Sequence, residues 1–395
     1  MSKEKRRVPK LRFPGFAEDW EQRKLSELAT MNARIGWQNL RTSEFLDNGD
    51  YLLITGTDFD NGRIKYSTCH YVEKKRFDQD TKIQLSTGSI LITKDGTLGK
   101  VALVEELPKP ATLNAGVFNV RVKDDAFLSY KYLYHYLKAP FLMKYVTANA
   151  TGGTIKHLNQ SILVDFPIPI TEKQEQDRIA KLLDSLESII TLHQRKLNNL
   201  KLKKKALLQK LFPKNGERYP ELRFPGFTDA WEQRKFGDLF EYERPDAYIV
   251  KSDNYNDDFN MPVLTANKAF ILGYTNEENS YNKPSIIFDD FTLDRKYVDF
   301  PYMLKSSAIK ILTSKNQHNL RFLFERLNST RFELLGHARH YISVVQNTIT
   351  FCPSVEEEVC ISNLLTKFDE LITLHQRKLD HLQLQKKALL QQMFV

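Results

Sequence analysis

The sequence predicts an α+β fold in which two mixed α/β domains are separated by two long antiparallel α-helices, with pseudo-two-fold symmetry. Two internal repeats predict this fold class. Residues 9–28 read PKLRFPGFAEDWEQRKLSEL and residues 220–239 read PELRFPGFTDAWEQRKFGDL, with 13 of 20 positions identical at an offset of 211. Residues 190–197 and 372–379 both read ITLHQRKL, at an offset of 182. Repeats of this kind are typical of one structural unit that is used twice.

The order along the chain is shared block, variable block and shared helix, followed by the same three again. One scaffold with two different inserts suits a protein that reads two different targets in a fixed geometry. We therefore divide the chain into a first α/β domain (1–171, with the shared block 9–28), a central long helix (172–213), a second α/β domain (214–355, with the repeated block 220–239) and a distal long helix (356–395).

The two long helices are predicted from apolar residues that recur every three or four positions. In the first helix, Thr171 and Gln174 form a capping box, and Pro213 ends the helix. In the second, Ser354 and Glu357 form the equivalent box. About 41 residues at about 1.5 Å each make a rod of roughly 60 Å.

An apolar stripe of this length must be buried, and the other long helix is the obvious partner. Because the two halves of the chain end at equivalent places, we expect an antiparallel pair. His193 and His375 are equivalent, and we interpret them as polar residues that set the register rather than as metal ligands. The residues expected at the helix-pair interface are Leu186, Ile190, His193, Leu197, Leu200, Phe368, Ile372, His375, Leu379 and Leu382.

The composition indicates a soluble protein with a polyanionic partner. Lys and Arg total 58 against 49 for Asp and Glu, a formal net charge of +9, although an ordinary basic protein would look the same. The three cysteines, Cys69, Cys352 and Cys360, are too widely spaced for a disulfide framework or a zinc site. The N-terminal residues lack the apolar core of a signal peptide, and no stretch approaches 18 apolar residues. We therefore expect a cytoplasmic protein that binds no metal.

The variable blocks carry no visible catalytic motif. The sequence has no Pro-Pro pair of the kind that adenine methylation motifs use, no Gly-x-Gly, no GxSxG and no HExxH. The segment Gly96–Val101 has the wrong spacing for a phosphate-binding Walker loop. We therefore expect no catalytic residues in this chain.

The first variable block carries binding chemistry instead. Residues 51–56 and 89–93 are predicted as buried strands, and a turn over residues 94–100 leads to a strand over 101–104. Lys94, Asp95, Gly96, Thr97 and Lys100 in this turn suit contacts with phosphates and base edges. The alternative is an ordinary hairpin with charged decoration.

A second cluster lies at residues 151–157. Paired glycines allow a close approach of backbone to a ligand, so Gly152, Gly153, Thr154 and Lys156 are candidate DNA contacts. The alternative is a flexible loop before a strand at residues 162–166. Residues 130–145 are predicted as one helix whose tyrosines belong to the core and its rim rather than to a stacking platform.

In the second variable block, the matching strand is residues 285–288, but no DGTxGK turn follows. Arg339, His340 and Tyr341 stand where the first block has its glycine cluster. The Arg339 guanidinium suits bidentate contact with guanine or phosphate, and a salt bridge to local carboxylates is the competing interpretation.

The whole pattern resembles the DNA-specificity subunit of type I restriction-modification systems. The matching segments are ILITKDGTLGKVA (90–102), TLNAGV (112–117), the passage from FPIP (166–169) into EKQEQ (172–176), the doubled LRFPGF…WEQRK blocks and the doubled helices. The resemblance implies two target recognition domains, each reading one half of a split double-stranded DNA sequence, and paired helices that set the spacer between the halves.

The resemblance also implies partners and cofactors. Two methylation subunits would dock on the helices, and two restriction subunits would join them. Those subunits would use S-adenosylmethionine, ATP and Mg, whereas this chain would bind none of these. Two other classes stay open from the residues alone. One is a free-standing nucleic-acid-binding regulator with two modules, and the other is a coiled-coil assembly protein.

Overall fold

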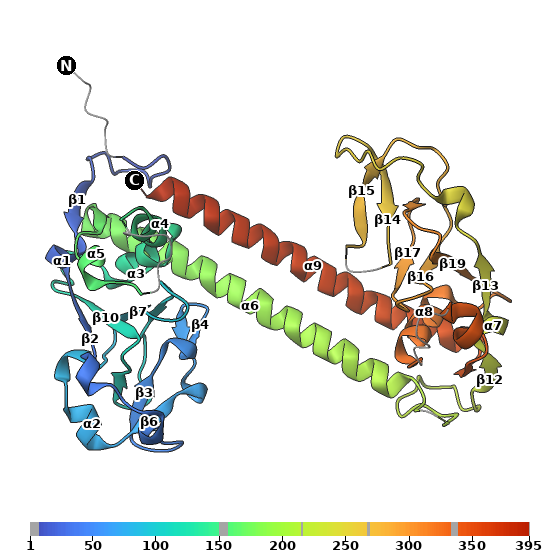
Figure 1. Cartoon of the computed structure of the whole chain (residues 1–395), viewed down its shortest axis with the longest axis horizontal. Coiled ribbons are helices and arrows are strands. Elements are labelled where there is room, and N and C mark those ends of the chain that lie inside the picture. The colour runs from blue at the N-terminus through green and yellow to red at the C-terminus, as the bar shows by residue number, and fades with distance from the viewer. Residues whose placement is uncertain (1–7, 150–156, 215, 267–268, 333–338, 395) are drawn as a thin grey trace. The chain divides into compact units, whose positions relative to one another are not determined.

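The computed structural model of the chain describes residues 8–149, 157–214, 216–266, 269–332 and 339–394 (Figure 1). The chain divides into two units. Unit 1 combines residues 1–192 with residues 378–395, and unit 2 is the stretch 193–377 that lies between them in the sequence. Each unit therefore contains one α/β domain together with part of both long helices.

In the described residues of unit 1, the α/β domain is built on three main sheets. A two-stranded sheet pairs β1 with β11, a four-stranded sheet has the order β2-β10-β7-β8, and a three-stranded sheet has the order β6-β3-β9, in which β3 and β9 run parallel. The strands are β1 (Glu21–Lys24), β2 (Ala29–Ala33), β3 (Tyr51–Ile54), β6 (His70–Val72), β7 (Ile90–Thr93), β8 (Val101–Leu103), β9 (Ala111–Leu113), β10 (Val117–Val122) and β11 (Pro167–Ile170), with a small hairpin of β4 (Phe59–Asp60) and β5 (Arg63–Ile64).

Unit 2 repeats the three main sheets strand for strand, whereas the β4–β5 hairpin has no counterpart among its described residues. Its sheets have the orders β12-β20, β13-β19-β16-β17 and β15-β14-β18, and β14 and β18 are again a parallel pair. The strands are β12 (Glu232–Lys235), β13 (Phe240–Glu243), β14 (Met261–Leu264), β15 (Ile271–Thr275), β16 (Ser285–Asp289), β17 (Arg295–Val298), β18 (Met303–Leu304), β19 (Ile309–Ser314) and β20 (Ile349–Cys352). The repeat therefore extends to the blocks whose sequences differ, and the predicted α+β class is confirmed.

The helices connect and cover these sheets. The two long helices, α6 and α9, each have 39 residues. The short helices are the single-turn α1 and α7, α2 in the first domain, α3 to α5 before β11, and α8 before β20. The bounds are α1 (Leu25–Leu28), α2 (Lys74–Asp78), α3 (Tyr130–Lys138), α4 (Pro140–Asn149), α5 (Gln160–Leu163), α6 (Lys173–Leu211), α7 (Phe236–Leu239), α8 (Leu320–Ser329) and α9 (Val355–Met393).

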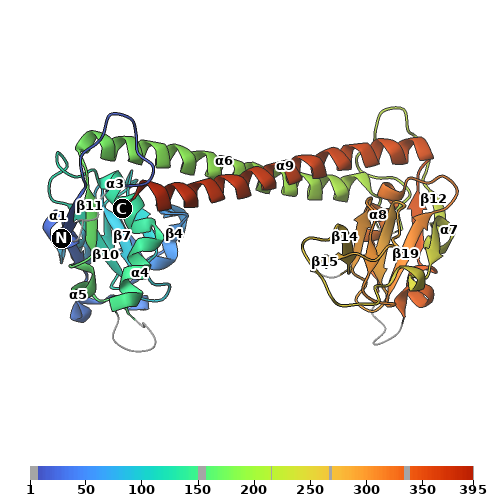
Figure 2. The same cartoon turned by 90° about the horizontal axis from the view of Figure 1, so that it is seen from above.

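Within each unit, the parts of α6 and α9 run antiparallel (Figures 1 and 2). In unit 1, Lys386 Nζ of α9 lies 2.5 Å from Glu187 Oε1 of α6, and Lys138 of α3 lies 2.9 Å from the same oxygen. Burial by itself would raise the pKa of Glu187, but Lys138 and Lys386 outweigh it and lower the pKa, so this carboxylate stays charged. One carboxylate therefore ties both long helices to the domain.

Unit 2 makes the same connection with residues at the repeat offset of 182. Lys204 Nζ of α6 lies 2.8 Å from Asp369 Oδ1 of α9. Arg321 of α8 pairs with the same Asp369 carboxylate. Lys204 also lies 3.0 Å from Glu325, whose side chain is 4% exposed. The helix pairing that the sequence predicts thus rests on equivalent charged contacts in both units.

A buried ion pair joins each shared block to the first turn of a long helix. Arg12 binds both carboxylate oxygens of Glu175 at 2.8 and 2.9 Å, and Arg223 binds both oxygens of Glu357 at 2.8 and 2.7 Å. The two glutamate side chains are 0% and 1% exposed. Such bidentate pairs have a fixed geometry as well as a strong attraction.

The residue before each arginine reaches the other long helix. In unit 1, the Leu11 N–H donates to the Gln392 carbonyl near the end of α9, at 2.9 Å. In unit 2, the Leu222 N–H donates to the Lys210 carbonyl near the end of α6, at 2.8 Å. Each shared block therefore bridges the beginning of one long helix and the end of the other.

Aromatic residues repeat the same bridging in the cores. Trp20 of the first shared block packs edge-on against Phe394, with ring centroids 6.4 Å apart, and Trp231 of the second packs edge-on against Phe212 at 6.1 Å. Edge-to-face pairs of buried rings are favourable beyond their burial. The residues that follow the ends of α9 and α6 thus complete the cores of unit 1 and unit 2.

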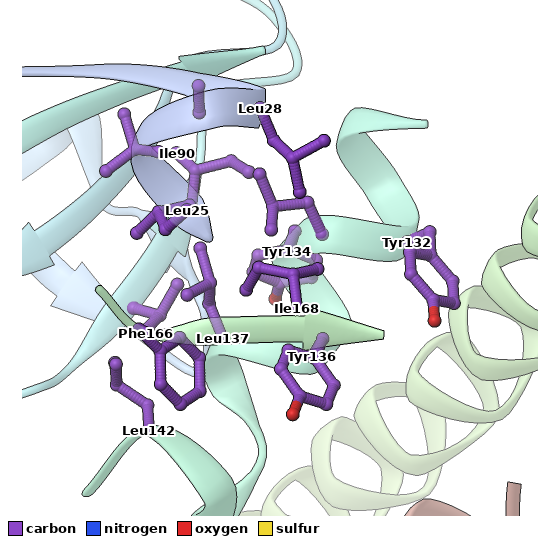
Figure 3. Packing of buried hydrophobic residues seen from close by; sticks show 14 of the residues in the cluster. Leu25, Leu28, Ile90, Tyr132, Tyr134, Tyr136, Leu137, Leu142, Phe166 and Ile168 are labelled. Carbon is purple, nitrogen blue, oxygen red and sulfur yellow. The ribbon is translucent and has the colours of Figure 1, made fainter. Parts of the chain in front are cut away.

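Another part of the core of unit 1 lies where α1, α3, β7 and β11 meet. Figure 3 shows Leu25 and Leu28 of α1 with Ile90 of β7, Leu137 of α3 and Ile168 of β11 gathered in one cluster. The tyrosines of α3 belong to it, since Tyr132, Tyr134 and Tyr136 are all buried. The expectation that these tyrosines are core residues is confirmed.

Two local predictions are wrong, and a proline explains the first. Residues 130–145 form two helices rather than one, because Pro140 begins α4 and forces Ala139 into extended backbone. Residues 160–163 form the helical turn α5, whereas a strand was expected over 162–166. The strand lies further on, at β11, where Pro167 and Pro169 are tolerated because β1 is the one strand of the described residues that pairs with β11.

At the beginning of α6 and α9, the predicted capping residues bind other partners than we expected. The Thr171 hydroxyl donates to Glu175 rather than meeting Gln174, and the carboxylate of Glu357 is taken by Arg223. The Glu357 N–H still donates to Ser354 Oγ at 3.4 Å.

Replacing Arg223 by alanine should lower the free energy of unfolding by about 3–5 kcal/mol, because it leaves the Glu357 charge buried without its partner. Arg12→Ala should act in the same way on unit 1. Chemical denaturation followed by circular dichroism measures both. The matched control is Lys173→Ala, which removes an exposed pair with Asp177 and should change stability by about 0.5 kcal/mol or less. An Arg223→Ala variant as stable as this control would show that the buried pair is not a stabilising link.

Candidate nucleic-acid interface

The predicted turn in the first domain connects β7 and β8 and is closed by Thr93. The Thr93 hydroxyl donates to the Thr97 carbonyl at 2.5 Å and accepts from the Lys100 N–H at 2.9 Å. Gly96 and Gly99 adopt φ values of +70° and +69°, which favour glycine. A Cβ at Gly99 would also collide with Met143. The turn is therefore a defined structure rather than a loose loop.

The polar side chains of this turn face outward. Asp95, Thr97 and Lys100 are exposed, and Lys94 is half-buried with its Nζ 5.7 Å from the centre of the Phe118 ring. A cation over a ring face is held in place without being neutralised. The turn thus presents two cations and two hydrogen-bonding side chains to solvent, as phosphate and base-edge contacts require.

The last residue of the second predicted cluster, His157, and the residue after it contact the turn. The Leu158 N–H donates to the Lys94 carbonyl at 2.9 Å, and His157 Nδ1 lies 2.6 Å from Asp95 Oδ1. Gly152, Gly153, Thr154 and Lys156 lie outside the described residues, but the segment that follows them docks on the turn. His157 and Asp95, which are 62 positions apart in the sequence, therefore meet at one end of the four-stranded sheet.

In the second domain, the predicted residues Arg339, His340 and Tyr341 lie next to the turn that follows β16, as His157 lies next to the turn that follows β7. The His340 N–H and Nδ1 lie 3.0 and 2.9 Å from the Asp290 carbonyl, just beyond β16. Arg339 is exposed, as a DNA contact requires, whereas the side chains of His340 and Tyr341 are 0% exposed. Both side chains therefore belong to the core of the domain in this structure, and this corrects the prediction that His340 and Tyr341 touch DNA.

Sequence reasoning missed several residues that shape these turns. Thr93, Phe118 and Asp290 were not singled out, although Thr93 and Asp289 both end the strand before the turn. Asp289 closes its own turn by accepting from the N–H groups of Phe291 and Thr292 at 2.9 and 3.0 Å. Aligning the two variable blocks by their buried strands, rather than by motif, would have found these positions.

The predicted helix-pair interface residues are mostly removed from solvent. Leu186, Leu197, His375 and Leu379 are buried, and the others are half-buried, namely Ile190, His193, Leu200, Phe368, Ile372 and Leu382. His193 Nδ1 and His375 Nδ1 lie 2.9 Å apart, so one ring donates to the other. A polar residue that meets its own repeat is the arrangement expected of a register-setting position.

No metal-ligating group of three or more His, Cys, Asp or Glu side chains occurs among the described residues. Burial raises the pKa of the Cys69 and Cys352 thiols to about 12, so neither is activated as a nucleophile. Among the residues that the structure describes, no helix combines the length and the hydropathy that crossing a membrane requires.

Comparison with known proteins identifies the class. The family model described as type I restriction modification DNA specificity domain matches residues 17–202 and 228–384, and the chain belongs to this family. Each half thus carries one copy of the domain, and the resemblance seen in the sequence is confirmed. Membership supports a role in DNA sequence specificity.

Particular relatives agree. The chain is 41% identical over 133 residues to the EcoR124I/EcoR124II specificity subunit of Escherichia coli, a match that spans 32% of each chain. It is 23% identical over 397 residues to the putative MjaX specificity subunit of Methanocaldococcus jannaschii, covering 94% of this chain and 92% of that protein. The crystal structure of a type I restriction-modification S subunit from M. genitalium shares the fold, with a TM-score of 0.68 at 16% identity over 98% of this chain and 99% of that one.

Proposed function

We propose that this chain binds double-stranded DNA sequence-specifically as the non-catalytic specificity subunit of a type I restriction-modification system. Each α/β domain reads one half of a bipartite target, and partner subunits methylate adenine and cleave the DNA. The observation that carries the proposal is the duplicated specificity domain, in which one topology is used twice with different turn residues. We refer to the two α/β domains as the first and second readers.

The two readers support a split and asymmetric target. The turn of the first reader carries Lys94, Asp95 and Lys100, whereas the equivalent turn of the second carries Asp290 and Asp294 and follows Asp289. Base identity is read through hydrogen-bonding and apolar groups that differ from base to base. Readers with different side chains on one scaffold would therefore select different half-sites. The long helices that connect the readers would set the unread spacer between them.

The surface of the long helices supports a partner that binds twice. Three pairs of large apolar residues remain exposed at equivalent positions of the two long helices. Exposed apolar residues that gather on one element mark interaction sites. The pairs are Ile189 with Leu371, Leu192 with Leu374, and Leu202 with Leu384. We propose that two methylation subunits dock here, one on each copy, and that two restriction subunits join the assembly.

The proposal assigns cofactors to those partners. S-adenosylmethionine, ATP and Mg would be bound by the methylation and restriction subunits, and none by this chain. We also propose a cytoplasmic location for the assembly. The free-standing regulator differs in one testable respect: it would bind its DNA target tightly without a methylation subunit.

Exchanging residues 29–173 for the corresponding block of another family member should change one half of the methylated sequence and leave the other half intact. The physical reason is that each reader contacts its half-site independently. The measurement is co-expression with the methylation subunit, followed by mapping of modified adenines in the host genome. A change in both halves, or in neither, would contradict the two-reader model, and no adenine modification at all would contradict the proposed function.

Replacing Lys100 by alanine should weaken DNA binding and flatten its salt dependence. Each lost phosphate contact lowers the slope of log K against log salt by about 0.9 for duplex DNA. Lys94→Ala should act similarly, and Lys173→Ala, on a long helix, should leave the slope unchanged. Titrations by fluorescence anisotropy at several salt concentrations measure this. If the Lys100→Ala slope equals that of the unsubstituted chain, the turn does not face the phosphates.

A charge on the exposed apolar positions should block partner docking. Leu192→Glu should leave room for one methylation subunit, and Leu192→Glu combined with Leu374→Glu for none, because a buried unpaired carboxylate is costly. Light scattering on the purified complexes gives the stoichiometry. The matched control is Leu192→Met with Leu374→Met, which keeps the surface apolar. Retention of two subunits by the double glutamate variant would place the docking surface elsewhere.

A further inference from the structure

We infer that Asp290 and its partner Lys310 are positioning residues of the second reader. Asp290 holds in place a surface that contacts DNA and is formed by Phe291, Arg339 and Ile342. The inference rests on the proposed function and deepens it. Motif comparison does not locate this surface, because the DGTxGK turn of the first reader has no counterpart in the second sequence.

Backbone hydrogen bonds place Asp290 at the position of Lys94. In the first reader, the Lys94 N–H donates to the Gly116 carbonyl, and the Lys94 carbonyl accepts from the Leu158 N–H, both at 2.9 Å. In the second reader, the Asp290 N–H donates to the Ala308 carbonyl, and the Asp290 carbonyl accepts from the His340 N–H, both at 3.0 Å. The two residues therefore have the same place between the same elements.

Strand register identifies the partners of the two side chains as equivalent too. Phe118 of β10 pairs with Ile92 of β7, and Lys310 of β19 pairs with Phe288 of β16. Lys94 lies over the Phe118 ring and forms no ion pair among the described residues, whereas Asp290 Oδ2 lies 3.7 Å from Lys310 Nζ. The side chains of Asp290 and Lys310 are 1% and 4% exposed. The second reader thus has a carboxylate where the first has an ammonium group, and a lysine where the first has the ring.

The buried Asp290 holds the segment that begins at Arg339. Its Oδ1 accepts from the Tyr341 N–H at 2.8 Å, and its carbonyl receives both His340 donors. The Tyr341 ring packs against Tyr242 and Phe288, with centroids 5.5 and 5.7 Å away. These contacts pin two consecutive residues of the segment in the core, so the residues on either side of them are fixed in position.

The side chains left outside have the chemistry of base contact. Arg339 is exposed, and Phe291 and Ile342 are large apolar residues that are 43% and 53% exposed. Arginine forms bidentate contacts with guanine, and apolar side chains contact the methyl group of thymine. The carboxylates of Asp289 and Asp294 would repel phosphates, so this surface depends on base contacts more than the lysine-bearing turn of the first reader does.

The test uses the full-length chain with the methylation subunit that co-purifies with it. Mapping of modified adenines first defines the two halves of the target, and this step tests the proposed function separately. Binding is then measured to the intact target and to duplexes in which one half or the other is scrambled. The ratio of affinities gives the discrimination at each half-site.

Asp290→Ala should reduce discrimination at the second half-site about tenfold or more, the size of one or two mismatched base pairs, and leave the first half-site unchanged. Asp290→Asn should retain part of it, because the amide oxygen still accepts from the Tyr341 N–H. Lys94→Ala, at the equivalent position, should affect the first half-site only. Equal losses at both half-sites, or no loss at the second, would overturn the inference.

Arg339→Ala and Ile342→Ala keep the inference falsifiable if Asp290→Ala fails to fold. Both side chains are exposed, so thermal unfolding should be unchanged while discrimination at the second half-site falls. Unchanged discrimination in both variants would show that this surface does not contact DNA. A chain without substitutions that discriminates neither half-site would instead refute the proposed function.

Discussion

The structure depends on one buried ion pair that occurs twice, Arg12 with Glu175 and Arg223 with Glu357. Each pair fixes a shared block to the first turn of one long helix, and the leucine before each arginine binds a carbonyl near the end of the other. A helix of 39 residues with a single apolar stripe could pack against its partner in either direction. The two shared blocks select the antiparallel direction, because only an antiparallel partner brings the start of one long helix and the end of the other to the same block.

On this common frame, the two readers differ where the four-stranded sheet meets solvent. The first keeps Lys94 over the ring of Phe118 and available to a ligand. The second has an aspartate at the same place, neutralised by Lys310, which takes the place of the ring. The backbone contacts are conserved between the readers while the charge is reversed. In such a scaffold the strand register stays the same, whereas the side chains of the turn are free to vary.

Much of this organisation could be predicted from the sequence, because repeats and apolar periodicity report on scaffold and helices directly. The strands β7, β8 and β16 were predicted from their buried residues and turn signals. The sequence did not reveal that Pro140 divides a helix or that Pro167 and Pro169 lie in a two-stranded sheet, since the partner strand decides whether a proline is tolerated. The sequence also did not show which of the candidate side chains are exposed to solvent. His340 and Tyr341 have side chains that suit DNA, and only the tertiary contacts with Asp290 show that they are buried. The roles of Lys94, Lys100 and Arg339 in DNA binding stay predictions.

The division of the chain into units has a consequence for its synthesis. Unit 2 is one continuous stretch, so all of its core, including Phe212, is present once residue 377 has been made. The core of unit 1 also needs Met393 and Phe394. At a typical elongation rate of about 5–20 residues per second, the residues between 192 and 378 take roughly 10–40 s to emerge. During that interval, the aromatic site of Trp20, Tyr132 and Tyr136 lacks its last ring. The first reader is thus the first to be translated and the last to be completed.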